Sequence, residues 1–223
     1  MEAKLTGISR GETLRYLGWC GSRIPEELER ELVRCEALIF QTARPRAVWR
    51  LFELLPDQSL GGTTAFFEGQ DVPALLQDST RVILMAATLG AGTERLLRQS
   101  QARSMGEAVL LDALAGAAIE NVCDNLCEDL ARRFAPKHLT DRFSPGYGDF
   151  PVSRQRMFFD LLDITRQIGV TLTPSGLMLP QKSVTALMGV SDKPQEHRLR
   201  GCEACTLKET CTLRKEGAHC GHT

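Results

Sequence analysis

The sequence has almost no net charge, because 27 lysines and arginines nearly balance 28 aspartates and glutamates. A chain without an excess of one sign offers no electrostatic reason to bind nucleic acid or an anionic membrane surface. Apolar runs near the ~18 residues that span a bilayer are also missing, and the opening stretch MEAKLTGISRGE lacks the apolar segment of a signal peptide. We therefore expect a cytoplasmic protein with neither nucleic acid nor a membrane as its partner.

The sequence also shows no internal repeat and no low-complexity segment. Its hydrophobic content of 43% and charged content of 25% are ordinary for a globular protein. A chain of 223 residues is long enough to bury a substantial core. We expect residues 1–192 to form the main domain, and residues 193–223 to form a linker and a small cysteine-rich tail.

Local patterns predict a mixture of helices and strands. Helical periodicity and capping signals predict helices over 24–40, 103–134 and 152–169. In the last of these, Ser153 is the expected N-cap, and Gly169 is expected to end the helix. Apolar or alternating segments predict strands over 46–54, 64–68, 80–90, 169–174 and 183–191. The fold class predicted from these elements is α+β.

A glycine-rich turn, GAGTERLL at residues 90–97, follows the apolar strand. A Gly-x-Gly turn between a strand and a helix can cradle a phosphate. The rest of a dinucleotide-binding fingerprint is missing, so we interpret the segment as a plain turn into a helix with Thr93 as its N-cap.

The longest predicted helix carries two stripes. Its core stripe consists of Leu111, Ala115, Ile119, Val122, Leu126 and Leu130. A neighbouring stripe, at spacings of four, three and four residues, consists of Gly116, Glu120, Cys123 and Cys127. We interpret the two cysteines as packing residues, although a thiol pair one turn apart can also meet a metal. Cys35, on the core face of the first helix, is interpreted in the same way.

Four of the eight cysteines lie close together near the C-terminus: Cys202, Cys205, Cys211 and Cys220. Four thiolates at such spacings can close around zinc or a [4Fe–4S] cluster. His219 and His222 beside the last cysteine favour zinc, and the alternative without a metal is a reduced tail. We predict a metal site here.

The segment DRFSPGYGDFP is rich in residues that determine backbone shape. Pro145 fixes a φ angle, whereas Gly146 and Gly148 allow conformations closed to other residues. Arg142 offers a planar fork of donors that suits a carboxylate, and Tyr147 adds a ring with a hydroxyl group. The segment therefore predicts a binding loop for a small anionic or zwitterionic ligand.

Landmarks around this loop resemble the C-terminal activation domain of cobalamin-dependent methionine synthase. They are the Arg142-x-x-x-Gly146-Tyr147 motif, a helix ending in Ile168-Gly169, the segment Leu172-Thr173-Pro174-Ser175, and a strand opening on Ser183-Val184. The clear match covers about residues 140–190, and the landmarks keep their order and spacing.

This resemblance implies a C-shaped α+β domain with a twisted antiparallel sheet and flanking helices, which binds S-adenosylmethionine in a shallow groove. It implies that Arg142 holds the methionine carboxylate, Gly146 lets the backbone approach, Tyr147 lies near the sulfonium, and the backbone around Ser144 binds the rest. The implied function is reactivation of a cobalamin-dependent methyltransferase, which binds the cobalamin and is served in trans.

In this family, inactive cob(II)alamin is reduced by an external donor, such as a flavodoxin or a ferredoxin, and is methylated by S-adenosylmethionine. The need for a low-potential electron favours a [4Fe–4S] cluster over zinc in the cysteine tail, because zinc is not redox-active.

The sequence departs from the family at two acidic positions that contact S-adenosylmethionine, which align with Gly18 and Gly116. Glu120, one helical turn beyond Gly116, is the expected substitute, with Asp124 as a second candidate. An alternative interpretation is a docking or electron-relay protein that no longer binds S-adenosylmethionine. A third interpretation is a small zinc module attached to an unrelated binding domain.

Overall fold

The computed structural model describes residues 3–19, 23–194 and 209. The chain divides into two compact units, which are described separately below. The first unit comprises Met1–Val48, Ala86–Leu130 and Phe159–Val184. The second comprises Trp49–Met85, Ala131–Phe158 and Thr185–Thr223. Several long elements begin in one unit and end in the other, so the chain passes between them repeatedly.

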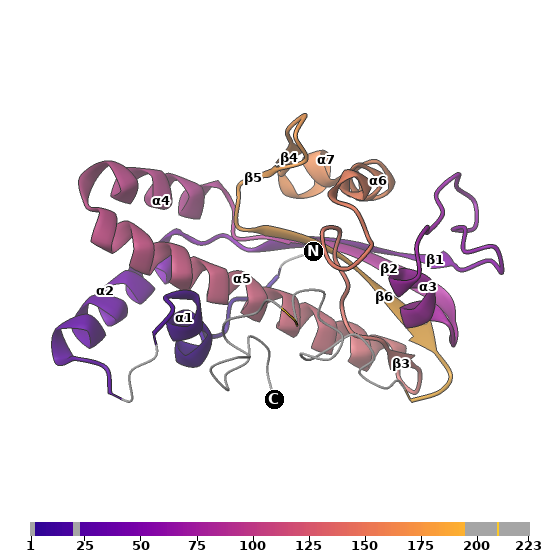
Figure 1. The fold of residues 1–223 in the computed structure, drawn as a ribbon, viewed down its shortest axis with the longest axis horizontal. Coiled ribbons are helices and arrows are strands. Elements are labelled where there is room, and N and C mark those ends of the chain that lie inside the picture. Colours follow the sequence, from indigo (N-terminus) through magenta and orange to yellow (C-terminus); the bar gives the residue numbers. More distant parts are fainter. Residues whose placement is uncertain (1–2, 20–22, 195–208, 210–223) are drawn as a thin grey trace. The chain divides into compact units, whose positions relative to one another are not determined.

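The first unit is mainly helical (Figure 1). Its helices are α1 (Arg10–Tyr16), α2 (Glu26–Thr42), α4 (Ala91–Arg103), α7 (Ile164–Ile168) and most of α5 (Met105–Phe134). A small antiparallel hairpin is formed by β4 (Thr171–Leu172) and β5 (Met178–Leu179). Helix α2 packs against α4, and an ion pair between Arg34 and Glu107 joins α2 to the first turn of α5.

Helix α2 confirms the predicted helical periodicity, and it begins directly after Pro25, which was expected in its first turn. Pro25 is its N-cap, and glutamates in its first turn favour the helix N-terminus electrostatically. Leu32, Cys35 and Ile39 are fully buried on one face. The interpretation of Cys35 as a core residue is confirmed.

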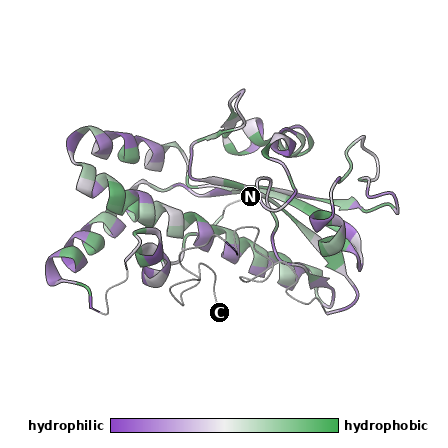
Figure 2. Ribbon diagram, viewed as in Figure 1, coloured by the Kyte–Doolittle hydropathy of each residue, from purple (hydrophilic) through white to green (hydrophobic). Residues whose placement is uncertain are grey.

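Helix α5 also follows its prediction closely. All six residues of its predicted core stripe are buried, and Figure 2 shows hydrophobic and hydrophilic residues alternating around this helix. In the second stripe, Cys123 is buried, whereas Gly116, Glu120 and Cys127 are half-buried. Cys123 is therefore a packing residue.

The glycine turn before α4 differs from the prediction. The N-cap is Gly90, with φ of 84°, and Thr93 is a fully buried residue of the helix itself. A Cβ on Gly92 would lie 2.3 Å from the backbone oxygen of Thr42, at the end of α2. The glycines thus allow two helix ends to approach closely, and the prediction of Thr93 as the N-cap is wrong.

The main sheet has four strands in the order β1 (Arg46–Glu53), β2 (Ser79–Thr88), β6 (Ser183–Ser191) and β3 (His138–Leu139). It is antiparallel: backbone bonds join Arg44 to Leu89 and Leu54 to Thr80, which flank β1 and β2 at opposite ends. Strand β6 is buried at every position except Val184. The alternation along this strand therefore does not mark a solvent-facing side.

Two predicted elements are shorter or broken. The expected strand at 64–68 contains only an isolated bridge between Phe66 and Ser59. The expected helix over 152–169 is a 3-10 turn (Val152–Arg154), then α6 (Gln155–Leu162), then α7. Asp163 separates α6 from α7 with φ of 51°, and Gly169 ends α7 as predicted, with φ of 74°. Ser153 is not an N-cap, because it lies within the 3-10 turn and Pro151 precedes that turn as its cap.

The second unit has an aromatic core around Phe150. Its ring centroid lies 6.1 Å from that of Phe67, 6.2 Å from Phe143 and 6.3 Å from Phe158. Phe150 is 1% exposed. Because Phe143 and Phe150 belong to the predicted binding loop, this cluster ties the loop to the core of the unit.

Candidate functional site

The predicted binding loop lies in the second unit, between β3 and the 3-10 turn. Its first part is joined to the sheet, because Phe143 and Leu187 of β6 exchange two backbone hydrogen bonds. Its last part is held by the buried ring of Phe150. The residues between these two anchors form the exposed tip.

A pair of aspartates joins the loop to α3 (Asp71–Leu76), and we call Asp71 and Asp149 the aspartate clasp. The Asp149 carboxylate accepts hydrogen bonds from the backbone N–H of Gln70 at 2.6 Å and of Asp71 at 3.2 Å. The Asp71 carboxylate accepts one from the backbone N–H of Asp149 at 3.0 Å. Each carboxylate thus binds the backbone beside the other, which fixes the loop against the start of α3.

Glycine is required at two positions of this loop. Gly146 has φ of 101° and donates its N–H to the carbonyl of Phe150 at 2.7 Å. Gly148 has φ of 52°, and a Cβ there would clash with the Asp71 carboxylate. Both values lie in the left-handed region that favours glycine, so the sequence Gly-Tyr-Gly determines the shape of the tip.

The tip presents an aromatic side chain to solvent. Tyr147 is 67% exposed, and its backbone N–H donates to the carbonyl of Ser144 at 3.2 Å. Arg142 and Ser144, nearer the anchors, are half-buried. A guanidinium at the base and an exposed phenol at the tip can hold a ligand that carries a carboxylate and a cation.

The first unit contains a cleft of its own, with a volume of about 450 Å³. Among the residues that line it are Tyr16, Met105, Val109, Asp112, Gly116, Glu120 and Lys182. A Cβ on Gly116 would lie 3.4 Å from the Tyr16 ring. The Tyr16 ring therefore packs directly against residue 116 of the second stripe, at the distance of an ordinary van der Waals contact from a Cβ there.

Tyr16 is the last residue of α1, and charged side chains surround its ring. The guanidinium of Arg15 lies 4.5 Å from the centre of its ring, and Glu12 pairs with Arg15. Burial, followed by the negative charge of Glu120, raises the pKa of the Tyr16 hydroxyl. Tyr16 therefore stays a protonated phenol at physiological pH, as an unperturbed tyrosine also does.

The start of the chain holds α1 in position over α5. The Asn121 side-chain oxygen accepts hydrogen bonds from the backbone N–H of Thr6 at 3.0 Å and of Gly7 at 3.3 Å. Asn125 donates to the backbone carbonyl of Lys4 at 3.0 Å. These bonds fix the segment that leads into α1 and thereby place Tyr16 against Gly116.

Comparisons with known proteins decide the family. A family model described as "Vitamin B12 dependent methionine synthase, activation domain" matches residues 76–211, which are more than half of the chain. The chain belongs to this family.

Solved structures add a likeness in fold. The structure of the MetH reactivation domain bound to AdoHcy is similar over 97% of this chain and 88% of that chain, with a TM-score of 0.56 and 16% sequence identity. No curated protein matches the chain by sequence. The mixture of helices and an antiparallel sheet that the resemblance implied, an α+β fold, is therefore shown.

The predicted site residues of this activation-domain chain are divided between the two units. Arg142, Ser144, Gly146 and Tyr147 belong to one loop of the second unit, whereas Glu120 lines the cleft of the first. Their assignment to S-adenosylmethionine stays a prediction. Gly18, at one of the aligned acidic positions, has φ of 66°, so its backbone favours glycine.

Sequence reasoning did not single out the polar cleft residues Tyr16, Asp112 and Lys182. They come from segments far apart in the chain, and their spacing gives no signal that joins them. Only the length and amphipathic pattern of α5, which places Asp112 four residues before Gly116 on one face, could have pointed to Asp112.

The predicted metal ligands Cys202, Cys205, Cys211 and Cys220 lie outside the described residues, so the metal site stays a prediction. Within the described ranges, no group of three or more histidine, cysteine, aspartate or glutamate side chains is arranged to hold a metal. Among the helices described, none is long and apolar enough to cross a membrane.

Proposed function

We propose that this chain binds S-adenosylmethionine through the loop at residues 142–151 and serves the reductive remethylation of cobalamin on a partner methyltransferase. Membership of the activation-domain family supports this proposal. The observation that carries it is the Arg-x-x-x-Gly-Tyr loop, held by the aspartate clasp and by Phe150, with its tyrosine exposed.

The groups of the loop fit the groups of this ligand. S-adenosylmethionine carries a carboxylate, which matches the guanidinium of Arg142, and a sulfonium cation, which the face of Tyr147 can attract. The positive φ of Gly146 and its missing side chain let a ligand approach the backbone. The backbone at Ser144 lies in the same turn. The backbone of the loop is held by the aspartate clasp and by Phe150, which reduces the ordering that binding requires.

The chemistry requires a methyl group and one electron. S-adenosylmethionine gives its sulfonium methyl and leaves as S-adenosylhomocysteine, while an external donor supplies the electron that cob(II)alamin needs to become methylcobalamin. The loop takes no part in bond making: Arg142 and Tyr147 orient the methyl donor, and the protein contributes position. The predicted [4Fe–4S] cluster in the cysteine tail belongs to the same proposal as a source of that electron.

Glu120 retains its predicted role in ligand binding as part of this proposal. Its carboxylate is the acidic group of the second stripe of α5 that lines the cleft with Tyr16 and Gly116. A carboxylate next to a neutral phenol offers acceptors for an ammonium or a hydroxyl group.

A second candidate function is a docking or electron-relay protein without a methyl donor. Two observations favour it: Gly18 adopts a left-handed backbone conformation that side chains other than glycine rarely adopt, and the Tyr16 ring lies over Gly116. The backbone at position 18 therefore disfavours a carboxylate residue, and at position 116 the Tyr16 ring occupies the neighbouring space.

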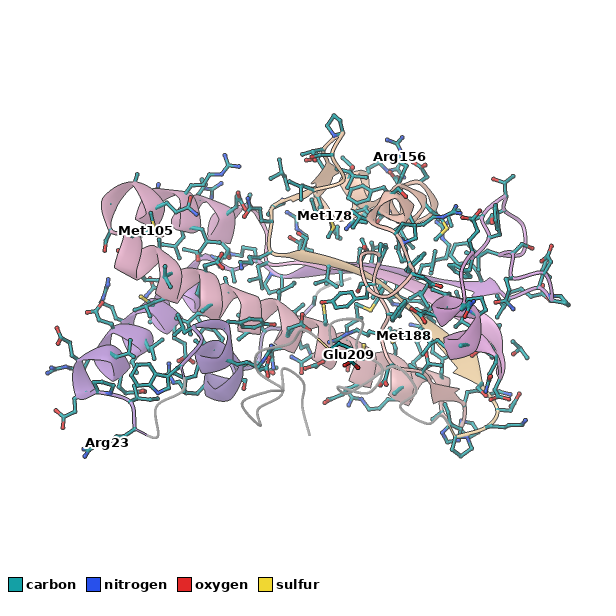
Figure 3. The ribbon with its side chains drawn as sticks, viewed as in Figure 1. Arg23, Met105, Arg156, Met178, Met188 and Glu209 are labelled. Carbon is teal, nitrogen blue, oxygen red and sulfur yellow. The ribbon has the colours of Figure 1, made fainter. Side chains whose placement is uncertain are left out.

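Calorimetric titration with S-adenosylmethionine distinguishes the two candidates. We expect saturable binding to the native protein and an affinity at least tenfold lower for Arg142→Ala, because a charged hydrogen bond contributes about 1.5–3 kcal/mol. Arg156→Ala, which removes an exposed arginine of α6 in the same unit (Figure 3), is the matched control and should bind normally.

Unchanged affinity in Arg142→Ala would exclude the loop as the binding site. Failure of the native protein to bind S-adenosylmethionine, also when a cobalamin-loaded methyltransferase is present, would support the docking function instead.

A further inference from the structure

One exposed face of helix α2 (Figure 1) repeats at alternating spacings of four and three residues. We call this face, together with the exposed arginine that follows the helix, the α2 seam; its six residues are Glu26, Arg30, Val33, Ala37, Phe40 and Arg44. Such spacing keeps side chains on one side of a helix and is the spacing of the contact positions in coiled coils. The α2 seam is distinct from the buried face of the same helix, which carries Leu32, Cys35 and Ile39.

The middle of the α2 seam is apolar and exposed. Val33 is 55% exposed and Phe40 is 42% exposed, and the exposed residue between them is Ala37. A single exposed apolar side chain is ordinary on a protein surface, whereas several that adjoin on one face indicate a contact surface. The small side chain of Ala37 leaves a shallow place between two larger ones, into which a side chain of another helix can pack.

Charged residues flank this apolar centre on both sides. Glu26 and Arg30 precede it, with Glu26 in the first turn of the helix. Arg44 follows the helix, and its guanidinium folds back on the last turn: Nη1 donates to the carbonyl of Gln41 at 3.0 Å and of Ala43 at 2.7 Å. The Arg44 charge therefore lies at the C-terminal end of the α2 seam.

We propose that the α2 seam binds the same seam of a second copy of this chain, with the two helices antiparallel. The spacings four, three, four, three and four read the same in both directions. An antiparallel copy centred on position 35 consequently places every seam residue opposite another one, as a twofold axis requires. Positions 26, 30 and 33 then face positions 44, 40 and 37 of the second copy.

The residues that meet in this arrangement are complementary in charge and size. The three contacts, each of which the twofold axis makes twice, are Glu26 with Arg44, Arg30 with Phe40, and Val33 with Ala37. The first is an ion pair, and the second places a guanidinium on an aromatic face. The third packs a larger apolar side chain against a smaller one.

Other occupants of the α2 seam fit less well. In a parallel pair in register, Glu26 would face Glu26 of the second copy and Arg44 would face Arg44, and like charges repel. A partner with one sign of charge would be repelled at one end of the seam, because the two ends differ in sign. The antiparallel second copy supplies the opposite charge at both ends.

This inference goes beyond the proposed function and does not depend on it, because every residue of the α2 seam belongs to the first unit and none belongs to the arginine loop. Binding of S-adenosylmethionine, or its failure, leaves the inference unchanged.

Sedimentation velocity of the full chain over a series of concentrations tests the contact. We expect a reversible dimer, of modest affinity because each copy contributes one helix. Phe40→Ala should raise the dissociation constant about tenfold, since it removes the largest apolar side chain of the seam. Leu177→Ala, which truncates a 64% exposed leucine between β4 and β5 of the same unit, is the matched control and should dimerise normally.

Charge reversal tests the antiparallel pairing. Glu26→Arg and Arg44→Glu should each weaken the dimer about tenfold, because both ion pairs become contacts between like charges. An equimolar mixture of the two variants should regain the native affinity within about threefold, because each end then joins a carboxylate to a guanidinium. Arg103→Glu, which reverses an exposed arginine at the end of α4, is the matched control and should leave the dimer unchanged.

A chain that stays monomeric up to about 1 mM would overturn the inference, also if a different protein bound the seam. So would a dimer that neither Phe40→Ala nor the two charge reversals weaken, since another surface would then form it. Reversals that weaken the dimer singly but are not rescued by mixing would overturn the antiparallel pairing. Circular dichroism and the melting temperature of each variant separate a loss of association from a loss of folding.

Discussion

Replacing Phe150 by alanine is expected to lower the free energy of unfolding by about 3–5 kcal/mol, the usual cost of truncating a buried phenylalanine. Phe150 is 1% exposed and contacts three other aromatic rings. The substitution leaves a cavity among Phe67, Phe143 and Phe158, and those rings lose both burial and ring–ring contacts. Because Phe150 also anchors the loop, the binding of S-adenosylmethionine should fall with stability.

Urea denaturation followed by circular dichroism measures this effect. Phe66→Ala is the matched control, because Phe66 lies in the same unit and its ring is exposed; we expect it to cost less than about 1.5 kcal/mol. A Phe150→Ala protein as stable as the control would show that the aromatic cluster does not support the loop.

Gly92→Ala is expected to destabilise the first unit by about 1–3 kcal/mol, the range for an added methyl group in a packed interior. The new Cβ would lie 2.3 Å from the backbone oxygen of Thr42. A backbone atom cannot rotate away as a side chain can, so α4 must shift from the end of α2. This cost exceeds the gain in helix propensity that alanine brings, about 1 kcal/mol.

Gly106→Ala supplies the matched comparison, since it is also a helical glycine but has nothing within 4 Å of its Cβ position. It should raise the free energy of unfolding by up to about 1 kcal/mol. Thermal melting of both variants checks the contrast. A melting temperature of Gly92→Ala equal to or above that of Gly106→Ala would contradict the close approach of α2 and α4.

The elements predicted best are those whose signals lie within the element. Helix α2 carries its cap and its apolar face in one short stretch, and β2 is apolar without interruption from Val82 to Ala87. The predicted strand at 64–68 failed because its pairing depends on the residues around Ser59. The break at Asp163 was missed because the helical pattern of the sequence continues through this residue, and tertiary structure overrides that pattern.

The same distinction applies to the candidate site: features set by local sequence could be predicted, and contacts between distant residues could not. The shape of the loop could be predicted, because proline and glycine constrain the backbone wherever they occur. The aspartate clasp could not, because Asp71 and Asp149 are 78 residues apart and no local pattern joins them. The same is true of Tyr16 and Gly116, whose contact exists only after α1 has packed on α5.

Transfer of a labelled methyl group tests the proposed function most directly. The full chain would be mixed with a cobalamin-loaded methyltransferase in the cob(II)alamin state, a one-electron chemical reductant and S-adenosylmethionine labelled in its sulfonium methyl group. We predict labelled methylcobalamin and an equal amount of S-adenosylhomocysteine, both lost in Arg142→Ala and retained in Arg156→Ala. Methylcobalamin formed at the same rate without this chain, or equally with Arg142→Ala, would contradict a role of the arginine loop in reactivation.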